Sequence, residues 1–235
     1  MNEMKKSLFT FGLSTLVLAA PLSANDMDYD KYFTIASVET TDITELDTRV
    51  NEAIGFVRAD SEDPIGEAEV ILDKIIAIGD KIWKIIERNK PVVNQNYKAL
   101  SLVPEGATKW EQLEQWQMPK TKVYSMNYKN GFGMSVVTFD YRIAFTYGGS
   151  VNGKGAYLSQ IQIEPALLNV AWGYTFNANG EVVNPTNAGT KANPIAAAEL
   201  RMNWRVNTVL KHSEESSRFY VRGDGLFKDL SNGTM

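Results

Sequence analysis

The chain contains no cysteine and only one histidine, His212, among its 235 residues. Zinc sites need several Cys or His ligands and Cys–His catalysis needs a thiol, so the composition excludes both. A Ser-His-Asp triad through His212 is formally possible, but the residue lies in "LKHSEESS", outside any G-x-S-x-G or comparable context. We therefore expect a solvated His212, and we predict no catalytic residue, no metal ligand and no cofactor.

The sequence also lacks a phosphate-binding glycine loop and a surplus of positive charge. Neither G-x-G-x-x-G nor G-x-x-x-x-G-K-[ST] occurs between a strand and a helix, and "GGSVNGKG" joins two alternating segments, which favours a hairpin. The formal net charge is −4. Because nucleic-acid binders use Lys and Arg to displace counterions, we expect no nucleic-acid partner.

Carboxylates are plentiful, and three of them could serve a hydrolase as a catalytic pair: Asp140, Glu164 and Glu199. Asp140 and Glu199 each have an arginine two residues further along the chain. Charge pairing on a solvated sheet face is therefore the plainer interpretation.

Two short motifs resemble binding sites but have simpler explanations. Asp26, Asp28 and Asp30 in "DMDYD" resemble the start of a calcium loop, but Lys31 stands where that loop needs glycine. "RGD" at residues 222–224 resembles the integrin-binding motif of adhesive proteins, yet Gly-Asp-Gly is also what a tight turn needs. We expect a solvated N-terminal segment and an ordinary turn.

The N-terminus has the pattern of a secretory signal peptide. Lys5 and Lys6 precede the apolar run "LFTFGLSTLVLAAP", and "LSA" ends at Ala24 before the polar "NDMDYD". A basic start, a short apolar centre and a small residue before the cut are typical of such peptides. We predict cleavage after Ala24 and export to the periplasm or the extracellular space.

Isoleucine dominates the stretch "AEVILDKIIAIGDKIWKIIERNKP", residues 68–91. Ile71, Ile75, Ile78, Ile82 and Ile85 are spaced 4, 3, 4 and 3 residues apart, as on one side of a coiled-coil helix. With Asp63 as N-cap and Pro91 after its end, this spacing predicts a long amphipathic helix over 64–90. Three roles stay open for it: a lid on the sheet, a contact surface for a partner or second copy, or a helix inserted in a membrane surface.

Two shorter helices are expected from caps and periodicity. Apolar residues at near-helical spacing after Asp42 predict a helix over about 43–58. Thr108 and Glu111 have the spacing of a capping box, which predicts a helix over 108–116.

From residue 120 onward the pattern alternates with a period of two, as in half-buried strands. The segments 137–147, 170–176 and 198–206 each place large apolar residues on one face. Asn130-Gly131, Asn152-Gly153, Asn179-Gly180 and Asp224-Gly225 are suited to tight hairpins. The alternation also assigns Trp172 and Trp204 to the core, and the tryptophan side of helix 108–116 should pack on the sheet.

These patterns together predict an α+β fold, with N-terminal helices packed on an antiparallel β-sandwich or a strongly curled β-meander. The expected divisions are a signal peptide (1–24), a lead-in with a short helix (25–63), the amphipathic helix (64–90) and a β-rich region (91–235).

By elimination, the function expected is that of an exported, non-enzymatic bacterial binding or interaction protein. A protein partner or self-association comes first, followed by a glycan or a lipid surface. The candidate interaction surface consists of the apolar residues with the least settled burial: Ile75, Ile82, Trp83, Trp110 and Trp116. A membrane-active protein and a carboxylate-dependent hydrolase are the alternatives.

Overall fold

The structure, a computed structural model, describes residues 28–46, 69–86 and 99–231. The described residues form eleven strands, one helix, α1 (Tyr29–Phe33), and one 3-10 turn, η1 (Trp110–Gln112). The strands are β1 (Ile35–Asp42), β2 (Ile71–Ile78), β3 (Ile82–Ile86), β4 (Leu100–Glu105), β5 (Lys120–Asn130), β6 (Ser135–Val151), β7 (Lys154–Val170), β8 (Thr175–Asn187), β9 (Ala196–Asn207), β10 (His212–Arg222) and β11 (Phe227–Asp229).

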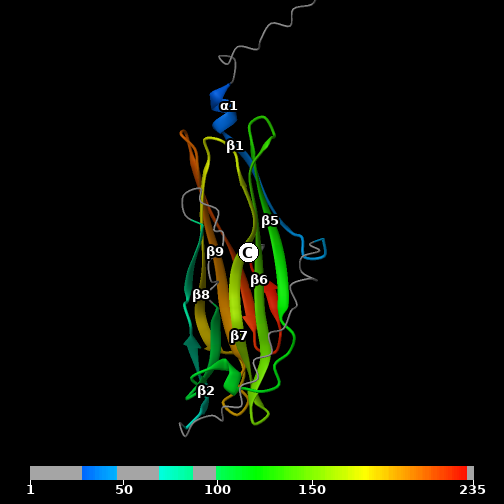
Figure 1. Ribbon diagram of the computed structural model, residues 1–235, viewed down its shortest axis with the longest axis vertical. Helices are drawn as coiled ribbons and strands as arrows, with labels where there is room; N and C mark the ends of the chain where they lie inside the picture. The colour runs from blue at the N-terminus through cyan, green and yellow to red at the C-terminus, as the bar shows by residue number, and fades with distance from the viewer. Residues whose placement is uncertain (1–27, 47–68, 87–98, 232–235) are drawn as a thin grey trace, which may run out of the picture.

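The strands form two antiparallel sheets that run along the long axis of the molecule (Figure 1). Sheet A has the order β1-β5-β6-β7-β4-β2, and sheet B has the order β11-β10-β9-β8-β3. Their inner faces enclose one core, which includes Phe139 and Tyr141 from sheet A and Phe176 and Phe219 from sheet B. The β-rich part of the expected fold is thus confirmed.

The alternating segments form strands as predicted, and they supply the core. Val137, Phe139, Tyr141, Ile143 and Phe145 on β6 are all at most 1% exposed. On β9 the residues of the same parity are buried in the same way: Ala198, Leu200, Met202, Trp204 and Val206. Strict alternation over a long strand leaves one face apolar, so two such sheets pack face to face.

One of the expected hairpins lies instead inside a strand. Asn179-Gly180 is in the middle of β8, whereas the other three Asn-Gly or Asp-Gly pairs lie at strand ends and turns. A Cβ on Gly180 would lie 3.2 Å from side-chain atoms of both Ile163 and Trp83. The glycine is therefore explained by close packing between the sheets and not by turn geometry.

The predicted helix over 64–90 is wrong. Its described residues form β2, at the edge of sheet A, and β3, at the edge of sheet B. Gly79 separates the two strands with φ +109, and a Cβ there would lie 2.3 Å from the carbonyl oxygen of Ala99. Both ends of that predicted helix, residues 64–68 and 87–90, lie outside the described residues.

The misleading isoleucine spacing has a structural cause. The pairing register of β2 shifts between Ile71 and Ile75, and that of β3 shifts between Lys84 and Ile86. An irregularity of this kind inserts an extra residue, so that the residues facing the core change from odd to even positions or the reverse. A strand with such an insertion can have inward-facing apolar residues that are three residues apart in sequence. The β-branched composition, which is poor for a helix, was the correct signal.

The two shorter helices are not found in the described residues either. Ile43–Leu46 contains a turn, and residues 47–58 lie outside the description. The helical residues among 108–116 are those of η1 alone, a single 3-10 turn. The Gln112 side chain, and not that of Glu111, accepts hydrogen bonds from the backbone N–H groups of Thr108 (2.8 Å) and Lys109 (3.0 Å).

Candidate functional site

The five residues of the expected interaction surface lie on three separate elements, β2, β3 and η1, and on the segment between η1 and β5. Ile75 on β2 is half-buried and packs against the core, and Trp83 on β3 is 7% exposed and belongs to it. Ile82, at the start of β3, is 64% exposed. Because these side chains differ in burial and in sheet, they do not form one surface.

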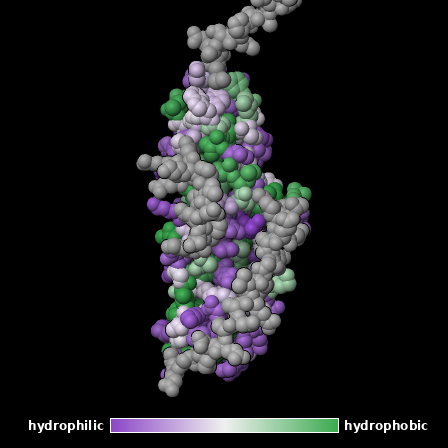
Figure 2. Space-filling view, in the orientation of Figure 1, coloured by the Kyte–Doolittle hydropathy of each residue, from purple (hydrophilic) through white to green (hydrophobic). Residues whose placement is uncertain are grey.

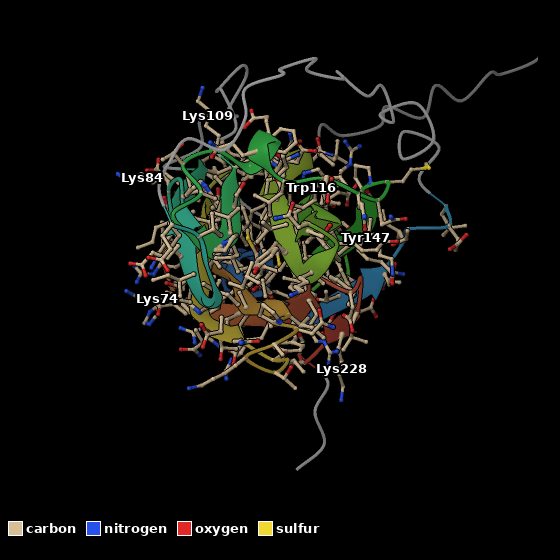
Figure 3. All side chains as sticks on the ribbon, turned by 90° about the horizontal axis from the view of Figure 1, so that it is seen from below. Lys74, Lys84, Lys109, Trp116, Tyr147 and Lys228 are labelled. Carbon is tan, nitrogen blue, oxygen red and sulfur yellow. The ribbon has the colours of Figure 1, made fainter. Side chains whose placement is uncertain are left out.

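Trp110 and Trp116 lie at the end of the sandwich opposite α1. Their rings contact each other edge to face with centroids 5.9 Å apart, and both are half-buried against the core. A Cβ on Gly149 would lie 2.3 Å from a ring carbon of Trp116, so the indole lies directly on the strand backbone. Figure 3 views this end, with Trp116 near Tyr147 and the labelled lysines at the rim. As expected, the tryptophan side packs on the sheet.

The carboxylates considered for hydrolysis lie on both sheets. Glu164 on β7 accepts a hydrogen bond from Arg142 Nη1 at 3.1 Å. Glu199 lies on β9, where it accepts a hydrogen bond from the Asn184 side chain at 3.4 Å. Asp140 lies on β6 in sheet A. Glu199 therefore points outward from the sheet opposite the one that carries Asp140 and Glu164.

The RGD turn is held by its own residues. Arg222 Nε and Nη2 donate to the two carboxylate oxygens of Asp224, at 3.2 and 2.5 Å. Burial alone would raise the pKa of Asp224, but hydrogen bonds from Arg222 and from the Leu226 N–H outweigh it and lower this pKa. Gly223 lies against the neighbouring backbone, where a Cβ would come within 1.9 Å of the Ala156 oxygen. Turn chemistry explains the motif.

The aspartates near the N-terminus begin a helix. Asp28 caps α1 by accepting a hydrogen bond from the Lys31 N–H at 3.0 Å, while Asp26 lies outside the description. Within residues 28–46, 69–86 and 99–231, no three His, Asp or Glu side chains are placed to hold a metal ion. In the same ranges, no helix has the length and apolarity to cross a membrane.

A different set of residues gathers at the α1 end of the sandwich. The β5–β6, β7–β8 and β9–β10 connections all lie at this end, as separate projections around α1 (Figure 1). Their exposed apolar side chains, with Tyr29 of α1, form what we call the apolar tip: Tyr29, Phe132, Met134, Trp172, Val209 and Leu210, which are 45–75% exposed. In Figure 2 green, apolar residues lie among pale purple ones at this upper end and recur along the middle of the molecule, whereas the lower end is mainly purple.

Helix α1 joins the three connections. The Gly131 N–H donates to the Lys31 carbonyl oxygen at 3.0 Å, and the Tyr32 hydroxyl donates to the Trp172 carbonyl oxygen at 3.1 Å. The Thr208 hydroxyl donates to the Phe33 carbonyl oxygen at 3.3 Å. The apolar tip is therefore presented on turns that are fixed relative to one another.

The Phe33 side chain closes the core beneath the tip. Its ring is 4% exposed and lies 6.0 Å, centroid to centroid, from both Trp172 and Tyr174. A Cβ on Gly173 would lie 2.5 Å from a Phe33 ring carbon, so this glycine makes room for the ring. Phe33 fills the core end, which leaves the tip side chains free to point outward.

The segments that carry the tip have no net charge. Residues 28–34, 130–134, 170–174 and 207–212 contain two acidic residues, Asp28 and Asp30, and two basic ones, Lys31 and Lys211. The Lys31 ammonium lies 4.8 Å from the centre of the Phe132 ring. An apolar surface with balanced charge attracts partners through desolvation and not through long-range electrostatics.

Sequence reasoning missed the apolar tip and assigned Trp172 to the core, which is wrong because Trp172 is 74% exposed. Trp204, by contrast, is buried as predicted, at 4%. A usable signal was present in "NGFGM" and "AWGY", where large apolar residues stand beside turn-forming glycines. A side chain at the tip of a hairpin has no second sheet to cover it, so the turn context outweighs the alternation.

Comparisons of the chain with protein-family models, with curated proteins and with solved structures find no match.

Proposed function

We propose that this is an exported, non-enzymatic bacterial protein that binds a lipid membrane surface through the apolar tip. The observation that carries the proposal is that six of the twelve exposed large apolar side chains of the described residues lie together at one end of the elongated sandwich. Exposed apolar side chains that gather on one part of a folded protein are typical of a contact with a partner or with a membrane.

The shape of the tip favours a bilayer over a protein partner. The side chains project from separate turns (Figure 1) instead of forming one flat patch. A protein partner would need a complementary cavity for each projection, whereas lipid chains rearrange around them. Trp172 and Tyr29 are also the residue types enriched at the membrane interface, where one part of the ring is apolar and another part is wet.

The expected strength corresponds to reversible binding. Full burial of a large apolar side chain contributes ~2 kcal/mol, so transfer of the exposed half or more of six such side chains gives on the order of 6 kcal/mol. A single myristoyl chain also supports only reversible membrane binding. Because the tip segments carry no net charge, binding should need no anionic lipid and should change little with salt.

Co-sedimentation with phosphatidylcholine vesicles tests the proposal. Val209→Ser combined with Leu210→Ser should weaken binding by ~2 kcal/mol, or about thirtyfold, because two exposed apolar side chains are removed. The matched control is Met118→Ser with Leu226→Ser, two residues of similar exposure, 61% and 44%, at the opposite end. The control should bind as the unchanged protein does. Equal loss in both variants, or no binding by the unchanged protein, would contradict the proposal.

A protein partner or a second copy is the other candidate function. The observation that favours it is that Ile82, on β3 at the edge of sheet B in the described residues, is 64% exposed. Edge strands offer unpaired backbone groups to another strand. Ile82→Lys should shift the protein from dimer to monomer in sedimentation velocity if this surface is used, and a monomeric unchanged protein would remove this candidate.

A further inference from the structure

The turn that carries Val209 and Leu210 and the adjoining outer face of sheet B line a shallow, open hollow of about 500 Å³. We propose that this hollow binds the headgroup of a zwitterionic phospholipid. The inference rests on the proposed function, since it assumes that the apolar tip meets a bilayer, and it names the lipid class that the tip would recognise.

The wall nearest the tip is apolar and rigidly held. Val209 and Leu210, which are 75% and 52% exposed, line the hollow. The Thr208 hydroxyl accepts hydrogen bonds from the N–H groups of Leu210 (3.2 Å) and Lys211 (2.9 Å), which fixes the turn. The same hydroxyl is anchored to the Phe33 carbonyl oxygen of α1. If the turn enters a bilayer, the hollow behind it lies at the depth of the headgroups.

The next layer provides cationic and neutral hydrogen-bond donors. Lys211, His212 and Asn207 line the hollow, and His212 and Asn207 are partners in the β9–β10 register. Two residues further down, Arg205 faces the same hollow. Lys and Arg are the side chains that bind phosphate best, and a neutral imidazole still donates one N–H. These groups suit the phosphate of a lipid headgroup.

The layer furthest from the tip adds one carboxylate. Glu214 is the register partner of Arg205 and forms an ion pair with its guanidinium. Both side chains are more than half exposed, so the pair is screened by water and a second cation can reach the carboxylate. Arg205 has five N–H donors and keeps others for a phosphate.

The order of chemical groups along the outer face of sheet B matches the order in a zwitterionic phospholipid. Such a lipid presents acyl chains, then a phosphate, then an ammonium group. The hollow presents Val209 and Leu210, then Lys211 with His212, then Glu214. Residues two apart in a strand are separated by about 7 Å, so the donors and the carboxylate form successive layers. A headgroup without an ammonium would bring no second cation to Glu214, which would keep only its pairing with Arg205.

Vesicle composition separates this inference from the proposed function. The unchanged protein should bind phosphatidylcholine vesicles at least tenfold more tightly than vesicles of an uncharged galactolipid, which lack phosphate and ammonium. Equal binding to both would overturn the headgroup inference and leave tip insertion standing. Binding to neither would instead remove the proposed function.

Substitutions that remove a charge test whether the headgroup binds in this hollow. Lys211→Gln should reduce the affinity for phosphatidylcholine vesicles about tenfold and leave galactolipid binding unchanged. Lys228→Gln is the matched control, because it removes the same charge on β11, where Lys228 pairs with Tyr220 near the end of β10 away from the tip. Equal effects of the two substitutions would show a general charge effect and would overturn the site.

A soluble probe distinguishes a headgroup from free phosphate. His212 is the only histidine, so its ring proton signals are assigned without ambiguity in an NMR titration. Millimolar phosphocholine should shift them, and inorganic phosphate should do so at least fivefold more weakly. Glu214→Gln should weaken the phosphocholine response alone. Equal responses of the unchanged protein to both probes would contradict the inference.

Discussion

At the end opposite α1, the turns of the two sheets meet backbone to backbone, whereas at the tip a phenylalanine side chain fills the space between them. Gly148 donates to the Gly223 carbonyl oxygen at 2.8 Å, and Gly223 donates to that of Ala196 at 2.7 Å. The aromatic residues of this far end, such as Trp116, lie flat on glycine backbone. At the tip, Phe33 closes the core and other apolar side chains point outward.

The two ends thus differ in what their apolar residues do: those of the far end stabilise the fold, whereas those of the tip are available for binding. Both ends carry aromatic side chains, but those of the far end are half-buried and stabilise the closure. Those of the tip add little to stability while they remain exposed, because exposed apolar surface gains nothing from folding. Substitutions of apolar residues should therefore lower the stability at the far end and the membrane binding at the tip. Phe33, which is buried beneath the tip, should affect both.

The largest expected effect is that of Phe33→Ala. Removal of a buried phenylalanine leaves a cavity and costs about 3–5 kcal/mol of the free energy of unfolding. Tyr29→Ala, on the same helix but 51% exposed, should cost less than about 0.5 kcal/mol. Urea denaturation of both variants measures the contrast. A similar cost for the two would show that α1 does not close the core.

Glycine substitutions compare the two ends directly. A Cβ on Gly223 would lie 1.9 Å from the Ala156 carbonyl oxygen, and that backbone atom can move only with its strand. Gly223→Ala should therefore cost about 3 kcal/mol. Gly133, in the β5–β6 turn, has φ +78 and no atom within 4 Å of an added Cβ, so Gly133→Ala should cost about 1 kcal/mol for the left-handed backbone alone.

Thermal unfolding of the two glycine variants checks this order. If Gly133→Ala were the more harmful of the two, the account of a far end closed by backbone contact would be wrong.

A polar contact between the sheets gives an intermediate effect. The Tyr128 hydroxyl accepts a hydrogen bond from Trp204 Nε1 at 2.9 Å and donates to Glu215 at 3.1 Å. Tyr128→Phe leaves the indole N–H buried without this partner, which should cost about 2 kcal/mol. Tyr32→Phe is the control, because its hydroxyl makes an exposed hydrogen bond to the Trp172 carbonyl oxygen. Its expected cost is below about 1 kcal/mol.

Two buried tyrosines, Tyr128 and Tyr157, predict a loss of stability at high pH. Burial raises the pKa of Tyr128 and of Tyr157 from 10.0 to about 12, with nearby carboxylates adding to the shift. A pKa raised by folding stabilises the folded state fully below pH 10, and this contribution is lost as the pH rises toward 12. The free energy of unfolding should fall across this window, and the fall should be smaller in Tyr128→Phe. An unchanged slope in that variant would contradict the assignment.

The smallest expected effect lies in the far-end turn. The pKa of Asp224 is lowered in the folded protein, so its contribution is present above the ordinary carboxyl value of 3.8 and is lost as the pH falls below it. The side chain is 40% exposed, which screens the pair with Arg222. Asp224→Asn should change stability by less than about 0.5 kcal/mol at pH 7 and should flatten its decline in acid. A large loss at pH 7 would contradict this.

The sequence predicted the structure correctly where regular packing between the sheets decides a residue's position. It failed where a turn or a register shift decides that position. The alternation in β6 and β9 predicted strands and core correctly, because period two over many residues has one physical solution. The isoleucine spacing in β2 and β3 predicted a helix wrongly, because register shifts in both strands imitate a helical period. Trp172 was misplaced because alternation was continued into a turn, where no sheet covers the residue.

Because the chain contains no cysteine, a single introduced thiol can report directly whether the apolar tip enters a bilayer. Val209→Cys at the tip and Met118→Cys at the far end can each be labelled with a polarity-sensitive fluorophore and mixed with phosphatidylcholine vesicles that contain brominated lipid. If the apolar tip enters the bilayer, the fluorescence of the label at residue 209 shifts to the blue and is quenched, while the label at residue 118 reports water throughout. Quenching at residue 118, or no change at residue 209 under conditions where the protein sediments with the vesicles, would contradict this insertion.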